Sequence, residues 1–489
     1  MGNKLWATMP MDQIAAESRD SKLKRVLGPW QLTMLGIGCT IGTGIFVLTG
    51  VQAAVHAGPA IVLSFVIAGI GCVFAGLCYA EFAAMVPLAG SAYTYSYATL
   101  GEFAAWFIGW DLMLEYGVAS STVAVGWGRY FTKLLEHLHL PALPVALTSA
   151  PLVTVNGHHI VRSGAILNLP AMFIVALTAF ICYIGIKQSA WFNNIIVVIK
   201  VTIVIAIIGF GSFYVSTHNW VPFIPPNTGQ MGDFGWSGIM RAASIIFFAY
   251  VGFDAVSTAA QEAKNPQRDV SFGIMAGLLI CTLLYILMAG VLTGLLPYTQ
   301  LNDAAPVAVA LDAHPELRWL SNWVIPGALF GLTSVILVLI LGQARIMLAL
   351  SRDGLLPKSL GSIHPKFRTP HVATAITGVF ALIMAGVLPI DILSELVSIG
   401  TLLAFIMVCI GVLVLRHTRP ELPRPFRVRW PWVTCILGVL FCGGMMGFLD
   451  AGTWLRLLIW TVIGLGVYYF YGRHHSRLRQ VSAGGATRT

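Results

Sequence analysis

The chain alternates between long apolar runs and short polar segments, and this pattern predicts its secondary structure. A helix of about 20 apolar residues crosses the hydrocarbon core of a bilayer, because its backbone pairs within the segment. Twelve runs are predicted to do so: 30–54, 59–86, 102–131, 165–185, 190–214, 236–262, 271–296, 323–350, 371–389, 392–415, 431–450 and 453–472. We therefore expect an all-α integral membrane protein.

Composition agrees with this prediction. Of the 489 residues, 57% are hydrophobic and 10% are charged, whereas soluble domains carry about 45–50% apolar and about 25% charged residues. The chain has too few charges to cover a water-soluble surface. A soluble enzyme, a disordered protein and a secreted disulfide scaffold are therefore poor fits.

The positions of the cations predict an orientation. With the N-terminus in the cytoplasm, 22 of the 29 Lys and Arg residues fall on the cytoplasmic side, as the positive-inside rule requires. Both termini are predicted to be cytoplasmic in a multi-pass protein of the inner or plasma membrane. The net charge of +9 is spread between the apolar runs and forms no patch, so nucleic acid is not an expected partner.

The spans divide the chain into five regions. These are a cytoplasmic N-terminal arm (1–29), a first group of five spans (30–215), a second group of five (236–416), a final pair (431–472) and a cytoplasmic basic tail (473–489). The basic residues of the tail are predicted to serve topology and contact with anionic lipid: Arg473, Arg477, Arg479 and Arg488.

Spans one and six, which open the two groups of five, carry helix-breaking residues at mid-depth. Span one holds Gly42-Thr43-Gly44 within Thr40–Phe46, and span six holds Gly252 within Phe247–Asp254. Glycine costs about 1 kcal/mol relative to alanine inside a helix, and interrupted helices at corresponding positions of two halves point to a transporter site. The alternative is that these glycines only allow close helix packing.

An unwound segment at this depth suits a zwitterion. The N–H groups at the start of a half-helix attract a carboxylate, and freed carbonyl groups, including those of Phe248 to Val251, suit an ammonium group. An L-amino acid is the expected ligand, held largely by main chain.

Three charged residues share this depth and are functional candidates: Lys200 in span five, Glu115 in span three and Asp254 in span six. Burial disfavours the charged form of a lysine, as a proton-coupling site requires. The alternative is a permanent ion pair of Lys200 with Glu115, or with Asp111 on the same helix face. Asp254 either takes part in coupling or holds the unwound backbone.

Other titratable residues receive structural interpretations. Four acids near span ends are expected to face water or an interface: Glu81, Glu262, Asp391 and Glu395. All eight cysteines lie in apolar runs without ligand spacing and are expected to pack as small residues. A solvated loop is favoured over a metal site for His137, His139, His158 and His159. No metal or cofactor is expected, and the absence of the dipeptide Gly-Lys excludes a Walker A motif for ATP.

Several stretches together resemble the amino acid–polyamine–organocation superfamily, and most closely its cationic amino acid transporter branch with the bacterial amino acid permeases. They cover spans one to eight in order: Gly28–Gly38, Ile41–Gly50, Cys78–Phe82, Gly90–Tyr95, Gly109–Asp111 with Leu114–Tyr116, Ala249–Asp254 and Ser351–Pro357.

The resemblance implies a LeuT-type fold, in which spans 1–5 and 6–10 form inverted repeats and two helices are added. It places the substrate carboxylate at the backbone of Thr43, Gly44 and Ile45, beside Gly42. The amine would meet carbonyls near Thr40, Ile41, Phe248 and Val251, flanked by Ala249 and Gly252.

The same resemblance makes Phe248 an aromatic gate. It also places Lys200 where sodium-driven relatives hold their second ion, so protons rather than sodium are the expected driving ion.

The predicted function is therefore a secondary active permease that takes up L-amino acids with protons. The candidate side-chain pocket residues Val251 and Val338 are apolar, which favours small or medium neutral substrates beside or instead of cationic ones. The alternatives are an exchanger or uniporter, or an amino acid sensor of the same fold that does not transport. A membrane enzyme and a channel lack the necessary motifs, and an accessory subunit is left open.

Overall fold

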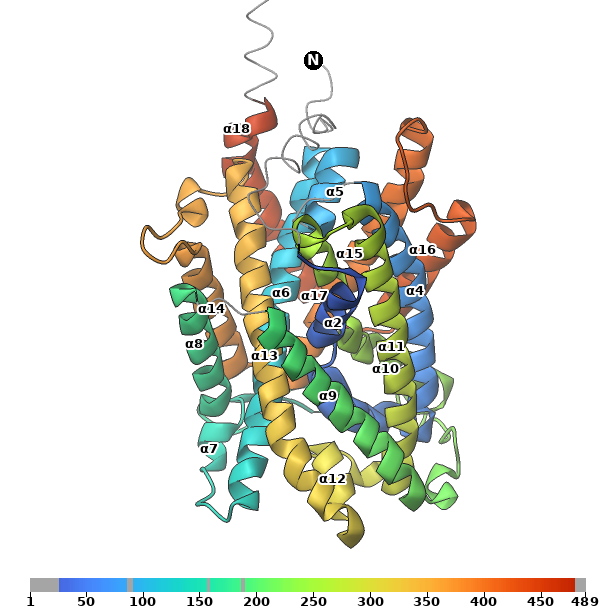
Figure 1. The fold of residues 1–489 in the computed structure, drawn as a ribbon. Helices are drawn as coiled ribbons and strands as arrows, with labels where there is room; N and C mark the ends of the chain where they lie inside the picture. The colour runs from blue at the N-terminus through green and yellow to red at the C-terminus, as the bar shows by residue number, and fades with distance from the viewer. Residues whose placement is uncertain (1–25, 86–90, 156–158, 186–189, 480–489) are drawn as a thin grey trace, which may run out of the picture.

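The protein is a bundle of helices that run roughly parallel to one long axis (Figure 1). The computed structural model describes residues 26–85, 91–155, 159–185 and 190–479. One end of the bundle carries α5 and α18 and is here called the α18 end; the opposite end carries α7 and α12 and is called the α12 end.

The first half of the chain contains the following elements: α2 (Pro29–Thr40), the π-helix η2 (Gly44–Leu48), α3 (Thr49–Gln52), the π-helix η3 (Ala53–Ala57), α4 (Ile61–Met85), α5 (Ser91–Thr99), α6 (Glu102–His137), α7 (Val145–Thr148), β1 (Leu152–Val155), β2 (His159–Arg162), α8 (Leu169–Ile184) and α9 (Ala190–Gly211). The strands β1 and β2 pair antiparallel as a hairpin.

The second half contains α10 (Gly235–Ile246), the 3₁₀ helices η7 (Phe247–Tyr250) and η8 (Asp254–Glu262), α11 (Pro266–Leu295), α12 (Pro306–Asp312), α13 (Arg318–Arg352), α14 (His371–Val387), α15 (Ile390–Thr418), α16 (Pro431–Gly447), α17 (Ala451–Val467), the π-helix η12 (Tyr468–Gly472) and α18 (Arg473–His475).

Helix occupies each of the twelve predicted ranges. Among the described residues, seven segments are long and apolar enough to cross a membrane: Gly44–Met85, Asn194–Tyr214, Gly235–Ser257, Pro266–Leu295, Pro315–Arg352, Ile390–Thr418 and Ala451–Arg479. Three shorter helices, α8, α14 and α16, are also apolar. The chain is therefore a multi-pass α-helical membrane protein.

The helices pack around α2, α6 and η7, which lie inside the bundle. α6 packs against α13 and α15, while α11 packs against α4 and α2. Many bulky apolar side chains of the outer helices remain exposed, among them Phe180, Phe330 and Phe470. An apolar outer surface is the arrangement expected where lipid, rather than water, surrounds the protein.

The C-terminal segment returns to the α18 end and packs against the start of α6. Glu102 is fully buried there and accepts hydrogen bonds from Tyr468 at 2.8 Å, from Arg479 Nε at 2.9 Å and from Ser476. Part of the predicted basic tail therefore holds an internal ion pair. Arg488 lies outside the described residues.

Candidate functional site

Both predicted helix interruptions are present. α2 ends at Thr40, Ile41 adopts an extended conformation with ψ of 102°, and helix resumes as η2 at Gly44. The first N–H groups of a helix have no intrahelical acceptor, so the start of η2 presents donors. These belong to the segment predicted to meet a carboxylate.

The second interruption follows α10. Its helix narrows to the 3₁₀ turn η7, Val251 is extended, and Gly252 has φ of +110°. A Cβ at Gly252 would lie 2.9 Å from Cβ of Cys39 in α2. Glycine is therefore needed at this position both for its backbone conformation and for the close approach of α2.

The two interruptions touch each other at Gly44. A Cβ on Gly44 would lie 2.3 Å from Cβ of Ala249 and 2.5 Å from its Cα. The hydroxyl of Tyr285 in α11 lies 2.8 Å from the carbonyl oxygens of both Thr40 and Ala249. Tyr285 thus joins the two unwound segments, a role that its sequence position in an apolar run did not indicate.

Lys200 contacts the interruption of α2 directly. Its side chain is 1% exposed, and Nζ donates to the carbonyl oxygens of Gly38 at 2.9 Å and Ile41 at 3.2 Å. The alternative of a permanent ion pair with Glu115 or Asp111 is wrong. Sequence gives the depth of a residue along a helix but not the neighbour it faces, and α9 turns Lys200 toward the α2 carbonyls.

A cluster of buried acids lies on the α6 side. All four carboxylate oxygens of Asp111 and Glu115 lack a hydrogen-bond partner among the described residues. Asp111 and Asp254 interact electrostatically with Glu115, and Tyr116 donates to Asp254 at 3.1 Å. The predicted coupling residues therefore form two groups: Lys200 of α9 contacts the interruption of α2, and the acids lie on α6 and η8.

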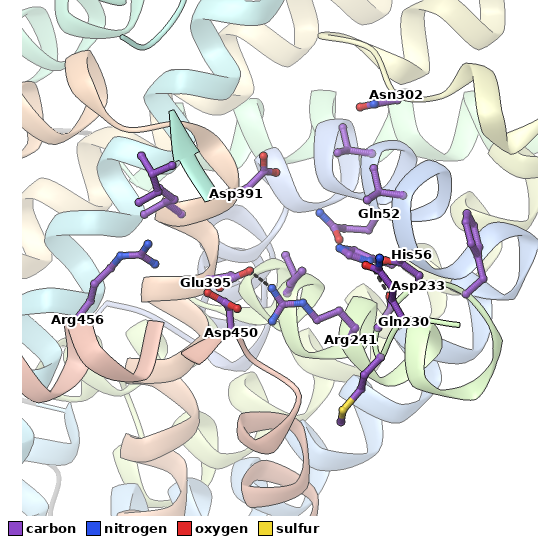
Figure 2. A pocket seen from close by; sticks show the side chains of 18 residues that line it. Gln52, His56, Gln230, Asp233, Arg241, Asn302, Asp391, Glu395, Asp450 and Arg456 are labelled. Carbon is purple, nitrogen blue, oxygen red and sulfur yellow. Dashed lines mark hydrogen bonds and ion pairs between the residues drawn. The ribbon is translucent and has the colours of Figure 1, made fainter. Parts of the chain in front are cut away.

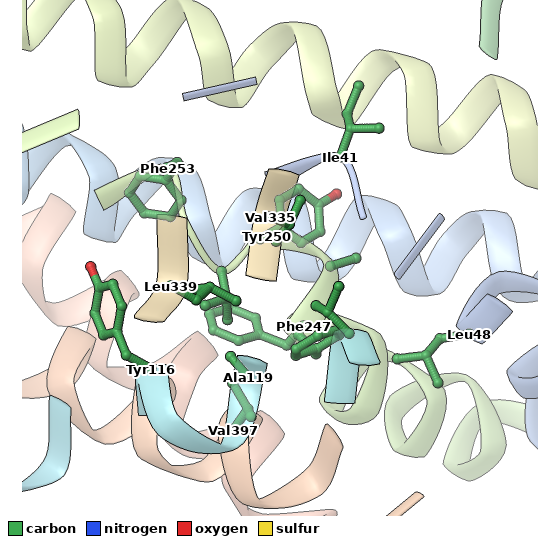
Figure 3. Close-up of a cluster of buried hydrophobic side chains, with 14 of the residues drawn as sticks. Ile41, Leu48, Tyr116, Ala119, Phe247, Tyr250, Phe253, Val335, Leu339 and Val397 are labelled. Carbon is green, nitrogen blue, oxygen red and sulfur yellow. The ribbon is translucent and has the colours of Figure 1, made fainter. Parts of the chain in front are cut away.

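A small cavity lies between the interruptions. It measures about 10 Å³, roughly the room for one water molecule. Its lining combines main chain of the unwound segments with aliphatic side chains: Cys39, Thr40, Gly42, Thr43, Gly44, Ala119, Val123, Phe248, Val251, Val335 and Leu339. Figure 3 shows Ala119 of α6 and Val335 and Leu339 of α13 approaching this region.

The predicted pocket residues need one correction. Val251 lines the cavity, but Val338 does not; its neighbours on the inner face of α13, Val335 and Leu339, do. Ile41, Ile45, Ala249 and Gly252 also lie outside the lining, although they are buried beside it. Phe248 lines the cavity and is 6% exposed.

Two acids that were expected to face water or an interface are instead buried and paired. Glu81 accepts from Arg416 Nε at 2.9 Å and from Arg416 Nη2 at 2.5 Å at the α18 end. Glu395 forms an ion pair with Arg241 at the α12 end. Their cations lie 335 and 154 residues away in the chain, so local patterning could not reveal them.

All eight cysteines are unpaired and buried, as expected for packing residues. Within the described ranges, no group of three or more His, Cys, Asp or Glu side chains is arranged to hold a metal ion. His158 lies outside those ranges.

Comparison with known proteins identifies the family. Residues 27–466 match the amino acid permease family. The chain is 46% identical over 470 residues to the branched-chain amino acid permease BcaP of Bacillus subtilis (strain 168), covering 96% of this chain and 97% of the relative. It is 44% identical over 480 residues to the methylthioribose transporter of the same organism, covering 98% and 100%.

A more distant relative is cationic amino acid transporter 3, mitochondrial, of Arabidopsis thaliana. It is 37% identical over 396 residues, which cover 81% of this chain and 63% of the relative. These proteins are named as permeases and transporters rather than enzymes. The chain belongs to the amino acid permease family within the amino acid–polyamine–organocation superfamily.

Proposed function

We propose that this protein is a secondary active permease for L-amino acids with aliphatic side chains. The observation that carries the proposal is the contact between two interrupted helices at a small cavity, where main chain and aliphatic side chains meet. The cavity is too small for an amino acid, so the substrate enters when the helices around it separate. Alternating access accounts for such opening from either side.

The main chain of this site would bind the substrate's charged ends. The carboxylate would accept hydrogen bonds from the N–H groups of Thr43, Gly44 and Ile45, where the helix dipole also favours a negative charge. The ammonium group would donate hydrogen bonds to the carbonyl oxygens of Phe248 and Val251. The carbonyl oxygens of Thr40 and Ile41 already accept hydrogen bonds from Tyr285 and Lys200, respectively. An oxygen with two lone pairs can accept a second donor.

The side-chain end of the site supports a branched-chain substrate. Ala119, Val123, Val335 and Leu339 contribute only aliphatic carbon atoms, which leave the charged end of arginine or lysine without a partner. The relative named as a branched-chain amino acid permease agrees with this preference. Methylthioribose is included in the uptake test below because a relative of similar sequence identity is named as a methylthioribose transporter.

Proton coupling is proposed for Lys200, Glu115 and Asp254. Lys200 fixes the interruption of α2 through two carbonyls, so loss of its proton would remove a charge that orders the substrate site. Glu115 and Asp254 would carry protons on the other side of that site. Because the Lys200 ammonium group already provides a positive charge at these carbonyls, protons rather than sodium are proposed as the driving ion, and exchange or uniport is the alternative mode.

The fold is proposed to be of the LeuT type, with twelve crossings and inverted repeats over 30–215 and 236–416. Both termini would lie in the cytoplasm of the inner or plasma membrane. The α18 end is then the cytoplasmic end, and the α12 end faces outward. The concentration of Lys and Arg on the loops of the α18 end supports this orientation.

Uptake into proteoliposomes tests the proposal. Labelled leucine, isoleucine, valine, alanine, arginine and methylthioribose are each supplied in sodium-free buffer, with and without an inward proton gradient. We expect uphill accumulation of the branched-chain amino acids. Equilibrating uptake alone would indicate uniport or exchange, and saturable binding without uptake would indicate a sensor.

The variant Lys200→Met tests coupling. For one proton per substrate, each pH unit of gradient supports at most about a tenfold accumulation. We expect Lys200→Met to lose this accumulation, whereas Lys264→Met, an exposed lysine at the α18 end, should retain it. Retained accumulation in Lys200→Met would refute the coupling role while leaving amino acid transport in place.

A further inference from the structure

A groove at the α18 end lies outside the central site. It measures about 560 Å³ and is formed by the start of α2 together with the segment 264–269 and Phe272 of α11. Its two walls are tied side by side, because the N–H groups of Val26 and Leu27 donate to the carbonyl oxygen of Glu262 at 2.9 and 3.0 Å. The groove therefore joins two helices that are far apart in the chain and holds them at a fixed spacing.

The exposed charges of the groove are positive. Lys264 and Arg268 are exposed, and neither forms an ion pair with another described residue. The carboxylate in the lining, Asp269, is 5% exposed and accepts the N–H of Asn265 at 3.1 Å, so it is used at the start of α11. Two cations, which together carry eight N–H donors, are left to face an anion.

Charges are arranged differently in the cavity at the α12 end. Figure 2 shows Arg241 paired there with Glu395, and Asp391 and Asp450 belong to the same lining. Carboxylates outnumber guanidinium groups in that cavity, which disfavours an anion. The groove at the α18 end has the opposite balance.

An apolar lane continues from the groove along α11. Trp30 and Phe272 line the groove, are 64% and 43% exposed, and contact each other edge to face with ring centres 5.6 Å apart. Leu279, Leu283 and Leu287 are exposed at later turns of α11, and their spacing places them on the same helix face as Phe272. The lane covers about 22 Å of helix, more than the roughly 15 Å of hydrocarbon in one leaflet.

The cations and the lane meet at the depth of lipid headgroups. The segment Pro266–Leu295 is long and apolar enough to cross a membrane, so its first turn lies where hydrocarbon ends and headgroups begin. Tryptophan is enriched at this boundary. Lys and Arg bind phosphate through charge-assisted hydrogen bonds, and the N-termini of α2 and α11 also favour a negative charge. The groove and the lane together match a phosphate group that carries an acyl chain.

We propose that the groove binds an anionic phospholipid, whose phosphate lies between Lys264 and Arg268 and whose acyl chain follows the exposed leucines of α11. One lipid then contacts both α11 and α2, the helix that ends at the first interruption. The site supplies no group to the central cavity. Loss of the lipid therefore leaves the number of protons per substrate, and with it the limit of accumulation, unchanged.

Native mass spectrometry of lipid binding tests this. Purified, delipidated protein in detergent is titrated with phosphatidylglycerol or with zwitterionic phosphatidylcholine. We expect one phosphatidylglycerol molecule per chain to bind about tenfold more tightly than phosphatidylcholine. Each Lys or Arg beside an anionic lipid contributes roughly fivefold in affinity, so the double variant Lys264→Gln with Arg268→Gln should weaken phosphatidylglycerol binding about 25-fold.

Two further double variants make the test specific. Arg352→Gln with Lys358→Gln removes the same charge from exposed positions at the same end and should leave the affinity near that of wild type. Lys264→Arg with Arg268→Lys keeps both charges and should retain most of the binding. All the altered side chains are exposed, so thermal unfolding without added lipid should be unchanged in every variant.

Soluble anions separate a lipid site from a phosphate site. Inorganic phosphate and glycerol phosphate carry the anion without acyl chains. At concentrations equal to that of phosphatidylglycerol, neither should displace the lipid. Displacement by either one would overturn the lipid assignment in favour of a free phosphate ion.

The remaining outcomes also decide the proposal. Wild-type affinity in Lys264→Gln with Arg268→Gln would overturn it, as would equal binding of the two lipids to wild type. An equal loss in Arg352→Gln with Lys358→Gln would overturn it by showing diffuse attraction to the charge of this end. Binding that appears only after removal of residues 1–24 would overturn it in favour of the N-terminal arm as the occupant. Amino acid transport is tested separately by the uptake assay, so its failure would leave this inference standing.

Discussion

The contact between the two interrupted helices makes Gly44 the most sensitive position in the central site. Carbon atoms normally approach to about 3.5–4.0 Å, but a methyl group at Gly44 would lie 2.3 Å from Cβ and 2.5 Å from Cα of Ala249. Relief requires a backbone shift of more than about 1 Å, since no rotamer change moves Cα. We therefore expect Gly44→Ala to abolish uptake, because the helices can no longer close over substrate.

The expected cost in stability follows from the same geometry. Inserting a methylene into a packed core costs about 1–3 kcal/mol, and a clash with backbone belongs at the upper end. About 3 kcal/mol corresponds to a more than 100-fold change in the folded-to-unfolded ratio. Thermal unfolding in detergent measures this loss, and uptake into proteoliposomes measures the activity.

Two comparisons make the test specific. Gly42→Ala, two residues away, would place its methyl 3.7 Å from Val335, which is ordinary contact, so its unfolding temperature should stay near wild type. Adding Ala249→Gly to Gly44→Ala should not restore uptake, because the 2.5 Å approach to Cα remains. Wild-type uptake and stability in Gly44→Ala would refute the reasoning that these helices meet in the transport cycle.

Three further predictions follow from the same structure. Leu339→Phe narrows the aliphatic end of the cavity and should lower leucine uptake relative to alanine uptake at least tenfold, since one methylene group changes selectivity by about 10–200-fold. The control Val338→Phe lies outside the lining and should leave this uptake ratio unchanged. Equal ratios in both variants would argue against this pocket. Arg241→Gln leaves Glu395 buried without its cation and should lower the free energy of unfolding by about 3–5 kcal/mol, as measured by thermal unfolding. The double variant Arg241→Met with Glu395→Leu should recover most of this stability. A double variant as unstable as the single one would show that the ion pair itself stabilises the fold. Arg479→Gln should lower the unfolding temperature more than Arg477→Gln, because Arg479 pairs with the fully buried Glu102 while Arg477 is exposed. Equal decreases in unfolding temperature would show that the ion pair contributes nothing measurable to stability.

The sequence predicted the elements well because hydrophobic length is a local property. Helix lies in each of the twelve ranges. α2 stops at Thr40, just before Gly42, and the 3₁₀ turn η7 that follows α10 stops at Tyr250, just before Gly252. The cavity beside Gly44 and Val251 could be anticipated for the same reason, since unwinding is encoded by the residues that unwind.

Lateral neighbours could not be predicted from one sequence. Lys200 and Glu115 share a depth, but the rotation of α9 and α6 about their axes directs Lys200 to the α2 carbonyls and leaves Glu115 among acids. Val338 and Leu339 are adjacent in sequence, yet only Leu339 faces the cavity. Tyr285 contacts two main-chain oxygens, and a pattern of side chains along the sequence does not indicate contacts to main chain.

The burial of Glu102 beneath the C-terminal segment has a consequence for biosynthesis. Its cation, Arg479, follows it by 377 residues, and translation at roughly 5–20 residues per second puts about 20–75 s between the two. During that interval, the start of α6 carries a carboxylate whose final partner has not yet been made. Assembly of the α18 end is therefore completed only after the last membrane helix has been inserted, and a nascent chain released early would expose an acidic end to quality control.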